Sequence, residues 1–145
     1  MISRRGFLTV TAASLCGAGC KGGSSGSREE VLPAMPLKLG QADEFQAGIT
    51  DLPLYRVRVY CRSVGAQRSL SALSMVCTHQ TCIVTREPDA SFTCPCHGSR
   101  FDAAGKLLAG PAARALPWYG LTLDERRGLW VHFDRLVDSS WSLSV

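Results

Sequence analysis

The chain has 145 residues, a length that suits one domain with a short additional segment. Hydrophobic residues make up 46% and charged residues 19%, values typical of a globular protein that can bury a core. The formal net charge of +4 is small, and no cluster of Lys and Arg is interleaved with aromatic residues. Charge and composition therefore argue against a nucleic-acid-binding surface.

Residues 1–19 have the layout of an export signal, with a charged start and a short apolar run that ends near Ala18. That run is too short for a membrane-spanning helix, which needs roughly 20 apolar residues. The segment Ser3-Arg4-Arg5-Gly6-Phe7-Leu8 resembles the twin-arginine signal of proteins that fold before export. An ordinary signal in which the two arginines occur by chance is the alternative.

Cys20 is a candidate lipidation site, because Gly17-Ala18-Gly19-Cys20 resembles a bacterial lipoprotein cleavage box. Gly17 stands where leucine is usual. Simple cleavage near Ala18 and an uncleaved signal anchor are alternatives. Residues 20–35 are rich in Gly and Ser and are interpreted as a flexible linker. The expected location is the periplasm or the outer face of the membrane, with a lipid tether.

Residues 55–61 alternate between apolar and polar side chains, a pattern that predicts a β-strand. One face of this strand is predicted to carry Val57, Val59 and Cys61, and the other Arg56 and Arg58. Cys61 is therefore interpreted as a buried thiol of the strand.

Further strands are predicted along the rest of the chain from Pro36 onward. Residues 69–76 form one candidate, and residues 120–123 and 128–133 are predicted to pair as a hairpin. His132 lies on the second hairpin strand without a ligand-like neighbour and is interpreted as structural or surface. The predicted fold class is all-β.

Four of the seven cysteines and two of the three histidines are concentrated in two short segments. These are Cys77-Thr78-His79-Gln80-Thr81-Cys82 and Cys94-Pro95-Cys96-His97-Gly98-Ser99. Thiolate and imidazole are suitable ligands for zinc or for an iron–sulfur centre. Zinc sites commonly use Cys-x-x-Cys spacing, which neither segment contains. A purely disulfide-bonded domain would leave the two histidines unexplained, and a redox-active thiol pair at 94–96 is a further alternative.

The two segments resemble the ligand loops of the Rieske iron–sulfur family, which read Cys-x-His and Cys-x-x-His. In that family two cysteines bind one iron and two histidines bind the other. By position, the resemblance implies that Cys77 and Cys94 hold one iron, that His79 and His97 hold the other, and that each chain carries one [2Fe–2S] cluster. The matching region covers roughly residues 70–117.

The resemblance also assigns roles to residues around the ligands. It implies a disulfide between Cys82 and Cys96, as in the cytochrome bc-complex branch of the family, and a hydrogen bond from Ser99 to a bridging sulfide. Phe101 stands where high-potential members have a tyrosine that donates a hydrogen bond to a cysteine sulfur, so the expected potential is somewhat lower. Gly110-Pro111-Ala112 resembles the family's proline loop.

The implied architecture is an antiparallel β-sandwich base within residues 36–145, with a cluster-binding subdomain inserted at about 75–102. The implied function is electron transfer: the chain would accept an electron from a quinol, with a proton on a ligand histidine, and pass it to a c-type cytochrome or similar acceptor. Any catalysis would belong to a quinol-oxidising membrane complex that includes the chain.

Two other assignments remain open. One is the small subunit of a periplasmic molybdenum oxidoreductase such as arsenite oxidase, whose large subunit would be the partner. The other is a free Rieske ferredoxin, which Cys82 and Cys96 disfavour because ferredoxins of the family generally lack that cysteine pair.

Overall fold

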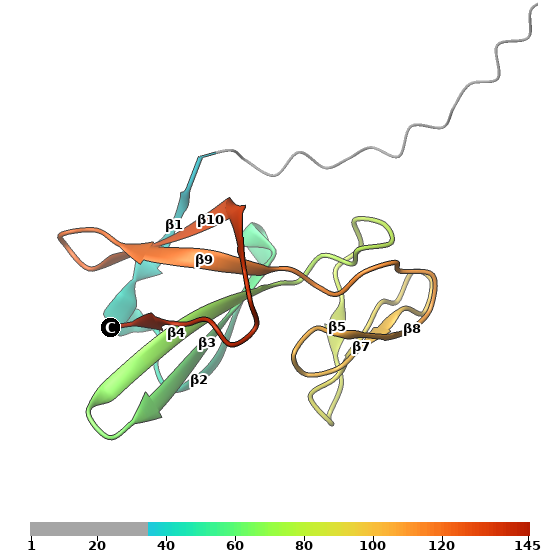
Figure 1. The fold of residues 1–145 in the computed structure, drawn as a ribbon, viewed down its shortest axis with the longest axis horizontal. Helices are drawn as coiled ribbons and strands as arrows, with labels where there is room; N and C mark the ends of the chain where they lie inside the picture. Colours follow the sequence, from blue (N-terminus) through green and yellow to red (C-terminus); the bar gives the residue numbers. More distant parts are fainter. Residues whose placement is uncertain (1–34) are drawn as a thin grey trace, which may run out of the picture.

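The computed structural model describes residues 35–145, which form two antiparallel β-sheets and only two short 3-10 turns (Figure 1). The elements in chain order are β1 (Leu37–Gln41), η1 (Ala42–Glu44), β2 (Gly48–Leu52), η2 (Pro53–Tyr55), β3 (Val57–Val64), β4 (Gln67–Ser74), β5 (Thr85–Arg86), β6 (Phe92–Thr93), β7 (Arg100–Phe101), β8 (Leu107–Ala109), β9 (Trp118–Leu123), β10 (Gly128–Val137) and β11 (Leu143–Ser144). The predicted all-β class is confirmed. The predicted signal, the linker up to residue 34 and Cys20 lie outside the described residues.

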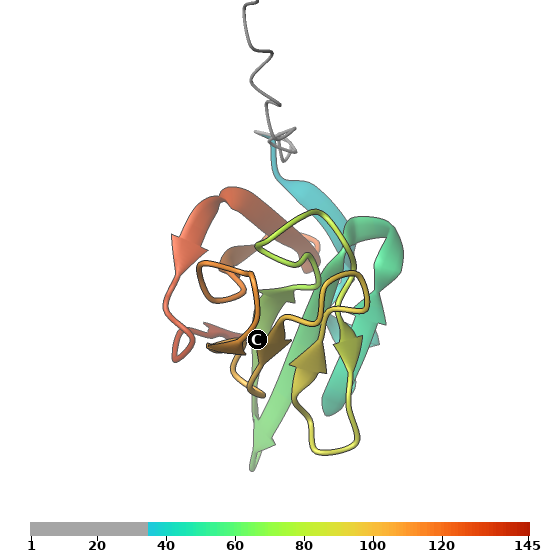
Figure 2. The ribbon, with the colours of Figure 1, turned by 90° about the vertical axis from the view of Figure 1, so that its right-hand side faces the viewer.

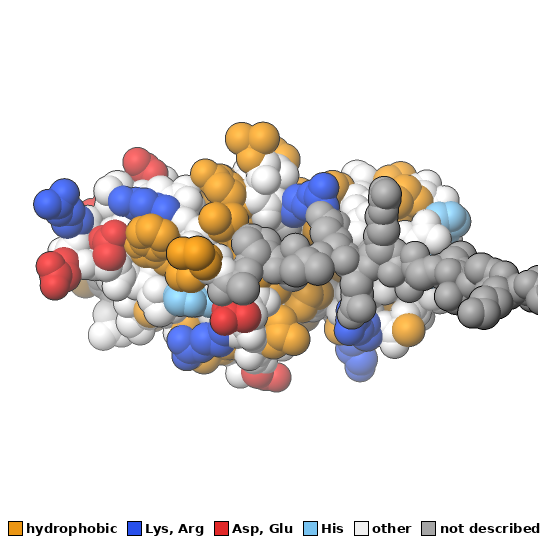
Figure 3. All heavy atoms as spheres, turned by 90° about the horizontal axis from the view of Figure 1, so that it is seen from above, with side chains coloured by type: hydrophobic (Ala, Val, Ile, Leu, Met, Phe, Trp, Pro, Cys, Tyr) orange, Lys and Arg blue, Asp and Glu red, His pale blue; other side chains and the backbone are white. Residues whose placement is uncertain are grey.

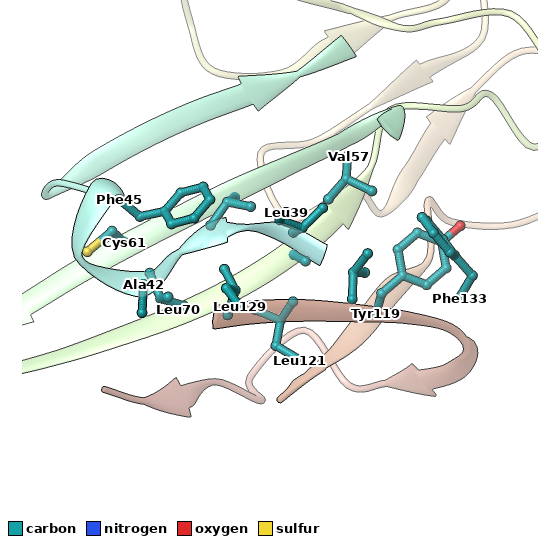
Figure 4. Close-up of a cluster of buried hydrophobic side chains, with 13 residues drawn as sticks. Leu39, Ala42, Phe45, Val57, Cys61, Leu70, Tyr119, Leu121, Leu129 and Phe133 are labelled. Atoms are coloured by element: carbon teal, nitrogen blue, oxygen red, sulfur yellow. The ribbon is translucent and has the colours of Figure 1, made fainter. Parts of the chain in front are cut away.

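The larger sheet forms the base of the molecule. Its strands lie in the order β1-β10-β9-β4-β3-β2, and β11 pairs with β4. The predicted strand at 55–61 corresponds to β3, and Val57, Val59 and Cys61 are all buried in the core on one of its faces. Figure 4 shows this core enclosed by β3, β4 and the β9–β10 hairpin. Alternation of apolar and polar residues thus places one face of each strand inside.

The β9–β10 hairpin agrees with the predicted one and closes through a turn organised by Asp124. The Oδ1 atom of this carboxylate accepts hydrogen bonds from the backbone N–H groups of Arg126 and Gly128, at 2.9 and 2.7 Å. The Oδ2 atom accepts one from the indole N–H of Trp130 at 3.0 Å. His132 contacts Thr122 on the neighbouring strand at 2.8 Å, which agrees with a structural role.

The smaller sheet has the order β5-β6-β7-β8 and is inserted between β4 and β9. It forms the right-hand part of the molecule in Figure 1 and faces the viewer in Figure 2. A second core joins it to the base, with Leu73 and Trp118 packed in one cluster with Phe92 and Phe101. The small sheet therefore covers the outer face of β3 and β4 around Arg58 and Leu73, whereas Arg62 and Val64 at the far end of β3 are exposed.

The inserted part extends further along the chain than the predicted boundary near residue 102. β8 pairs with β7, so the small sheet continues to Ala109. The chain reverses after Phe101 because the Asp102 side chain accepts hydrogen bonds from the N–H groups of Ala104 and Lys106, at 2.9 and 2.8 Å. This turn returns the chain along β7, and the base resumes only at β9.

Among residues 35–145, no helix has the length and apolarity required to cross a lipid bilayer. In the face shown in Figure 3, the visible Asp and Glu side chains lie toward the large-sheet end of the molecule, where they are mixed with Lys, Arg and His side chains. The small-sheet end of that face shows apolar, basic and histidine side chains.

Candidate metal centre

Two loops at the end of the small sheet carry the clustered Cys and His residues. The first loop lies between β4 and β5 and is closed by a hydrogen bond from the N–H of Cys77 to the carbonyl of Cys82, at 2.8 Å. The second lies between β6 and β7, where the N–H of Cys94 donates to the carbonyl of Ser99 at 2.8 Å. Gly98 has a φ of +73°, which allows this tight return. Each loop therefore starts at a cysteine beside the core and presents its histidine further out.

The four predicted ligand residues differ in exposure in a regular way. Cys77 and Cys94 are 3% and 1% exposed, and both thiols are free. His79 is partly buried and His97 is exposed. The two imidazole rings lie face to edge with 4.8 Å between their centroids. The loops thus bring two buried thiols and two adjacent imidazoles together, with the imidazoles nearer to water.

The Nδ1 atom of His79 is buried and has no hydrogen-bond partner among the described residues. A buried polar atom without a partner is costly, and such an atom in a native structure often points to an unseen ion or water. An iron atom would supply the missing partner for a neutral imidazole nitrogen. The donor set of two thiols and two imidazoles also fits the ligands of a Rieske-type centre.

Cys82 and Cys96 form a disulfide that connects the two loops. The sulfur atoms of Cys82, Cys94 and Cys96 all lie within 4.8 Å of one another. Two of these three are covalently joined and carry no free thiolate, so only Cys94 of this group can bind metal. The disulfide predicted from the resemblance is therefore present, directly beside one candidate ligand.

A third segment covers the two loops and is held by Ser99, which is fully buried. The N–H of Ala112 donates to the Ser99 hydroxyl oxygen at 3.1 Å, so the hydroxyl proton remains free to bond elsewhere. Gly110 has a φ of +101°, and a Cβ atom built there would lie 2.5 Å from the Cα of Ser99. The segment around Gly110 and Pro111 therefore needs glycine to approach the second loop so closely. Phe101 is fully buried in the cluster that also contains Cys77 and Cys94.

Thr78 is a functional contact that sequence reasoning missed. Its hydroxyl donates to the carbonyl of Arg114 at 2.6 Å and so links the first loop to the segment that follows Pro111. Thr78 lies between Cys77 and His79, but nothing in the sequence points from it to a residue so far along the chain. Together with the disulfide and Ser99, this bond holds the three segments as one unit.

The model of the Rieske [2Fe-2S] domain family matches residues 28–120, which is more than half of the chain. The chain belongs to the Rieske family. It is an iron–sulfur electron-transfer protein and binds one [2Fe–2S] cluster.

Similar Rieske proteins occur in several redox systems. An iron–sulfur subunit 1 of a cytochrome b6-f complex from Nostoc sp. is 47% identical over 71 residues, covering 48% of this chain and 35% of the relative. A protein from Haloferax mediterranei described as a respiratory nitrate reductase Rieske subunit is 42% identical over 55 residues, covering 37% of this chain and 25% of that one. The matched part thus spans only about a quarter to a third of the length of these curated relatives.

The solved structures include the plasma membrane Rieske protein of the cyanobacterium Synechocystis PCC 6803. It shares 33% sequence identity with this chain, with a TM-score of 0.44, over 66% of this chain and 97% of the other.

Proposed function

We propose that Cys77 and Cys94 bind one iron of the cluster through their thiolates, and that His79 and His97 bind the other. The observation that carries this assignment is the buried Nδ1 atom of His79, which has no protein partner among the described residues. The free, buried thiols of Cys77 and Cys94 support it. When bound, the cluster supplies one-electron redox chemistry at a potential above that of an all-thiolate centre, because two neutral imidazoles replace two negative ligands.

The buried and the exposed side chains of the site have different roles in this proposal. The two thiols lie against the core, where Phe101 and the disulfide limit access by water. His97 is exposed, so in this proposal its imidazole is the side chain that would receive the proton, in the state in which the ring nitrogen on the water side carries no hydrogen. In this proposal the electron and the proton leave the donor together, because both are received at the histidine side of the site.

A quinol is the donor that best fits the surface around the histidines. Apart from cysteine and histidine, the only charged residue in segments 77–83, 94–99 and 110–116 is Arg114. Ile83 and Leu108, which flank these loops, are 37% and 56% exposed. A nearly uncharged, partly apolar rim favours an apolar hydroxyl donor over a charged one. The acceptor in this proposal is a c-type cytochrome or a similar carrier within a cytochrome bc-type chain.

The second candidate function is electron transfer as a subunit of another oxidoreductase. The match to a protein described as a nitrate reductase Rieske subunit supports it, because that description assigns a similar domain to a different oxidoreductase. In that case the partner would be a large catalytic subunit, such as that of a periplasmic molybdenum enzyme like arsenite oxidase.

Two measurements test the assignment of ligands and partners. First, the purified full-length chain should contain acid-labile sulfide and show a Rieske-type EPR signal, with a midpoint potential that falls as pH rises through the alkaline range. His97→Ala and Cys77→Ala should each abolish the signal. A colourless, iron-free, folded protein, or a midpoint that does not change with pH, would contradict the proposal.

Second, the tagged chain should be purified from native membranes under mild detergent. Co-purification of a cytochrome b supports the quinol-oxidising chain, whereas a large molybdopterin subunit supports the alternative. Addition of a short-chain quinol to the purified complex should then reduce the cluster. No reduction would exclude the quinol as direct donor.

We also infer export by the twin-arginine route and lipidation at Cys20, which would hold the domain at the outer face of the membrane. Mass spectrometry of the mature chain should show an acylated Cys20 as the first residue. Arg4→Lys with Arg5→Lys should retain the protein in the cytoplasm, and Cys20→Ala should release it from the membrane. An unmodified Cys20 would overturn the inferred lipidation, and unchanged export of the double arginine variant would overturn the inferred twin-arginine route.

A further inference from the structure

Arg58 lies on the face of β3 that the small sheet covers. It is only 2% exposed, although it carries a full positive charge. Its guanidinium forms an ion pair with Asp51 on the neighbouring strand β2, directly opposite in the strand register. One bond of the pair, from Nη2 to Oδ2, measures 2.7 Å. Burial alone would lower the pKa of Arg58, but the hydrogen bonds and charge of Asp51 raise it above its usual value, so the side chain stays charged.

The same guanidinium contacts the strand that leads to a cluster ligand. It lies over the ring of Phe92, with 4.8 Å between the guanidinium carbon and the ring centroid. Phe92 is 1% exposed, begins β6 and pairs across the sheet with Phe101. Cys94 follows two residues later and belongs to the same buried cluster as Phe92 and Phe101. Arg58 is thus a cation of the base sheet that packs directly on the strand leading to Cys94.

The ion pair is asymmetric in its exposure to water. The side chain of Arg58 is 3% exposed, whereas that of Asp51 is 45% exposed. Water screens an exposed charge much more than a buried one. The carboxylate therefore cancels the guanidinium only in part on the buried side, and a net positive field reaches the small sheet.

We infer that Arg58 is a positioning residue for the cluster that acts through Phe92: it fixes β6 under the Cys94 loop, and its partly compensated charge favours the reduced, more negative cluster. This inference rests on the ligand assignment proposed above. The charge part of this role predicts opposite responses of the midpoint potential to removal of the cation and to removal of the anion. Loss of the cation should make reduction harder, whereas loss of the anion should make it easier.

The test is a redox titration of the full-length protein, followed by EPR and visible circular dichroism, in four variants. Arg58→Met should lower the equilibrium constant for reduction by at least roughly threefold, about 30 mV for a one-electron couple. Asp51→Asn should shift the midpoint in the opposite direction. Arg58→Lys keeps the charge and should restore most of the midpoint lost in Arg58→Met. Arg62→Met is the matched control, because Arg62 lies on the same strand but is exposed, and its midpoint should not change.

The outcomes separate this inference from the assignment of ligands. If the wild-type protein has no cluster, the ligand assignment fails first. If the wild type has its cluster and Arg58→Met and Asp51→Asn shift the midpoint in the same direction, or no more than Arg62→Met does, the role of Arg58 is refuted. Should Arg58→Met not fold, Asp51→Asn still decides, because it retains the cation and must raise the midpoint.

Discussion

The contact between Gly110 and the Ser99 loop yields a quantitative prediction for Gly110→Ala. An added Cβ would lie 2.5 Å from the Cα of Ser99, whereas ordinary contacts begin at 3.4 Å. The two segments must therefore separate by about 0.9 Å, the difference between these two distances. The hydrogen bond from Ala112 to Ser99 is already 3.1 Å long, so such a shift would break it.

The energetic cost has two sources. A residue with a side chain at a positive φ is strained by about 1 to 2 kcal/mol. A buried polar group that loses its hydrogen bond costs about 1 to 3 kcal/mol. Together they predict a destabilisation of about 2 to 5 kcal/mol, and each kcal/mol lowers the melting temperature of a domain of this size by about 4 °C.

The assay is thermal unfolding of the cluster-loaded protein followed by circular dichroism, together with the rate at which visible absorbance is lost. Gly65→Ala is the matched control, since Gly65 also has a positive φ of +61° but nothing lies within 4 Å of the position that the alanine methyl group would occupy. It should lose only the backbone part, about 1 to 2 kcal/mol. Equal melting temperatures and equal cluster loss in the two variants would refute the reasoning.

Three further predictions concern the cluster surroundings and the base. Phe101→Tyr should raise the midpoint potential, because the tyrosine hydroxyl adds a hydrogen-bond donor beside the cluster. Ser99→Ala should lower the midpoint potential. A redox titration in which both variants keep the wild-type midpoint would contradict these roles. Reduction of the Cys82–Cys96 disulfide, or the double change of Cys82 and Cys96 to serine, should lower the midpoint and accelerate cluster loss in chelator, because it unties the two loops. Hydrogen bonds from Trp130 and the Gly128 backbone hold the pKa of Asp124 below its usual value, so its carboxylate stabilises the fold above about pH 4 and this contribution is lost as pH falls through the lowered pKa. At about pH 6 the wild type should therefore melt at a higher temperature than Asp124→Asn, and this difference should disappear in more acidic buffer. A difference in melting temperature that persists at about pH 2 would contradict the stabilising role of the carboxylate.

Much of the fold could be predicted because its signals are local. The alternation in residues 55–61 predicts β3 and the burial of Cys61, and the turn residues between 123 and 128 predict the β9–β10 hairpin. Such patterns act over a few residues and need no knowledge of the partner strand. The end of the inserted sheet was predicted too early, because β8 is only a short strand whose pairing depends on the turn that Asp102 organises.

The sequence by itself determined the chemistry of the site: the types, order and spacing of the Cys and His residues, and the pairing partners available for a disulfide. Only the tertiary structure decided what surrounds that chemistry. The Nδ1 atom of His79 is buried only because other segments enclose it. The bond between Thr78 and Arg114 and the position of Arg58 over the ring of Phe92 join residues that are far apart in the sequence. The contact of Arg58 with Phe92 arises from the packing of the small sheet on the base. The bond between Thr78 and Arg114 joins two segments of the inserted part. No periodicity along the chain encodes either kind of contact.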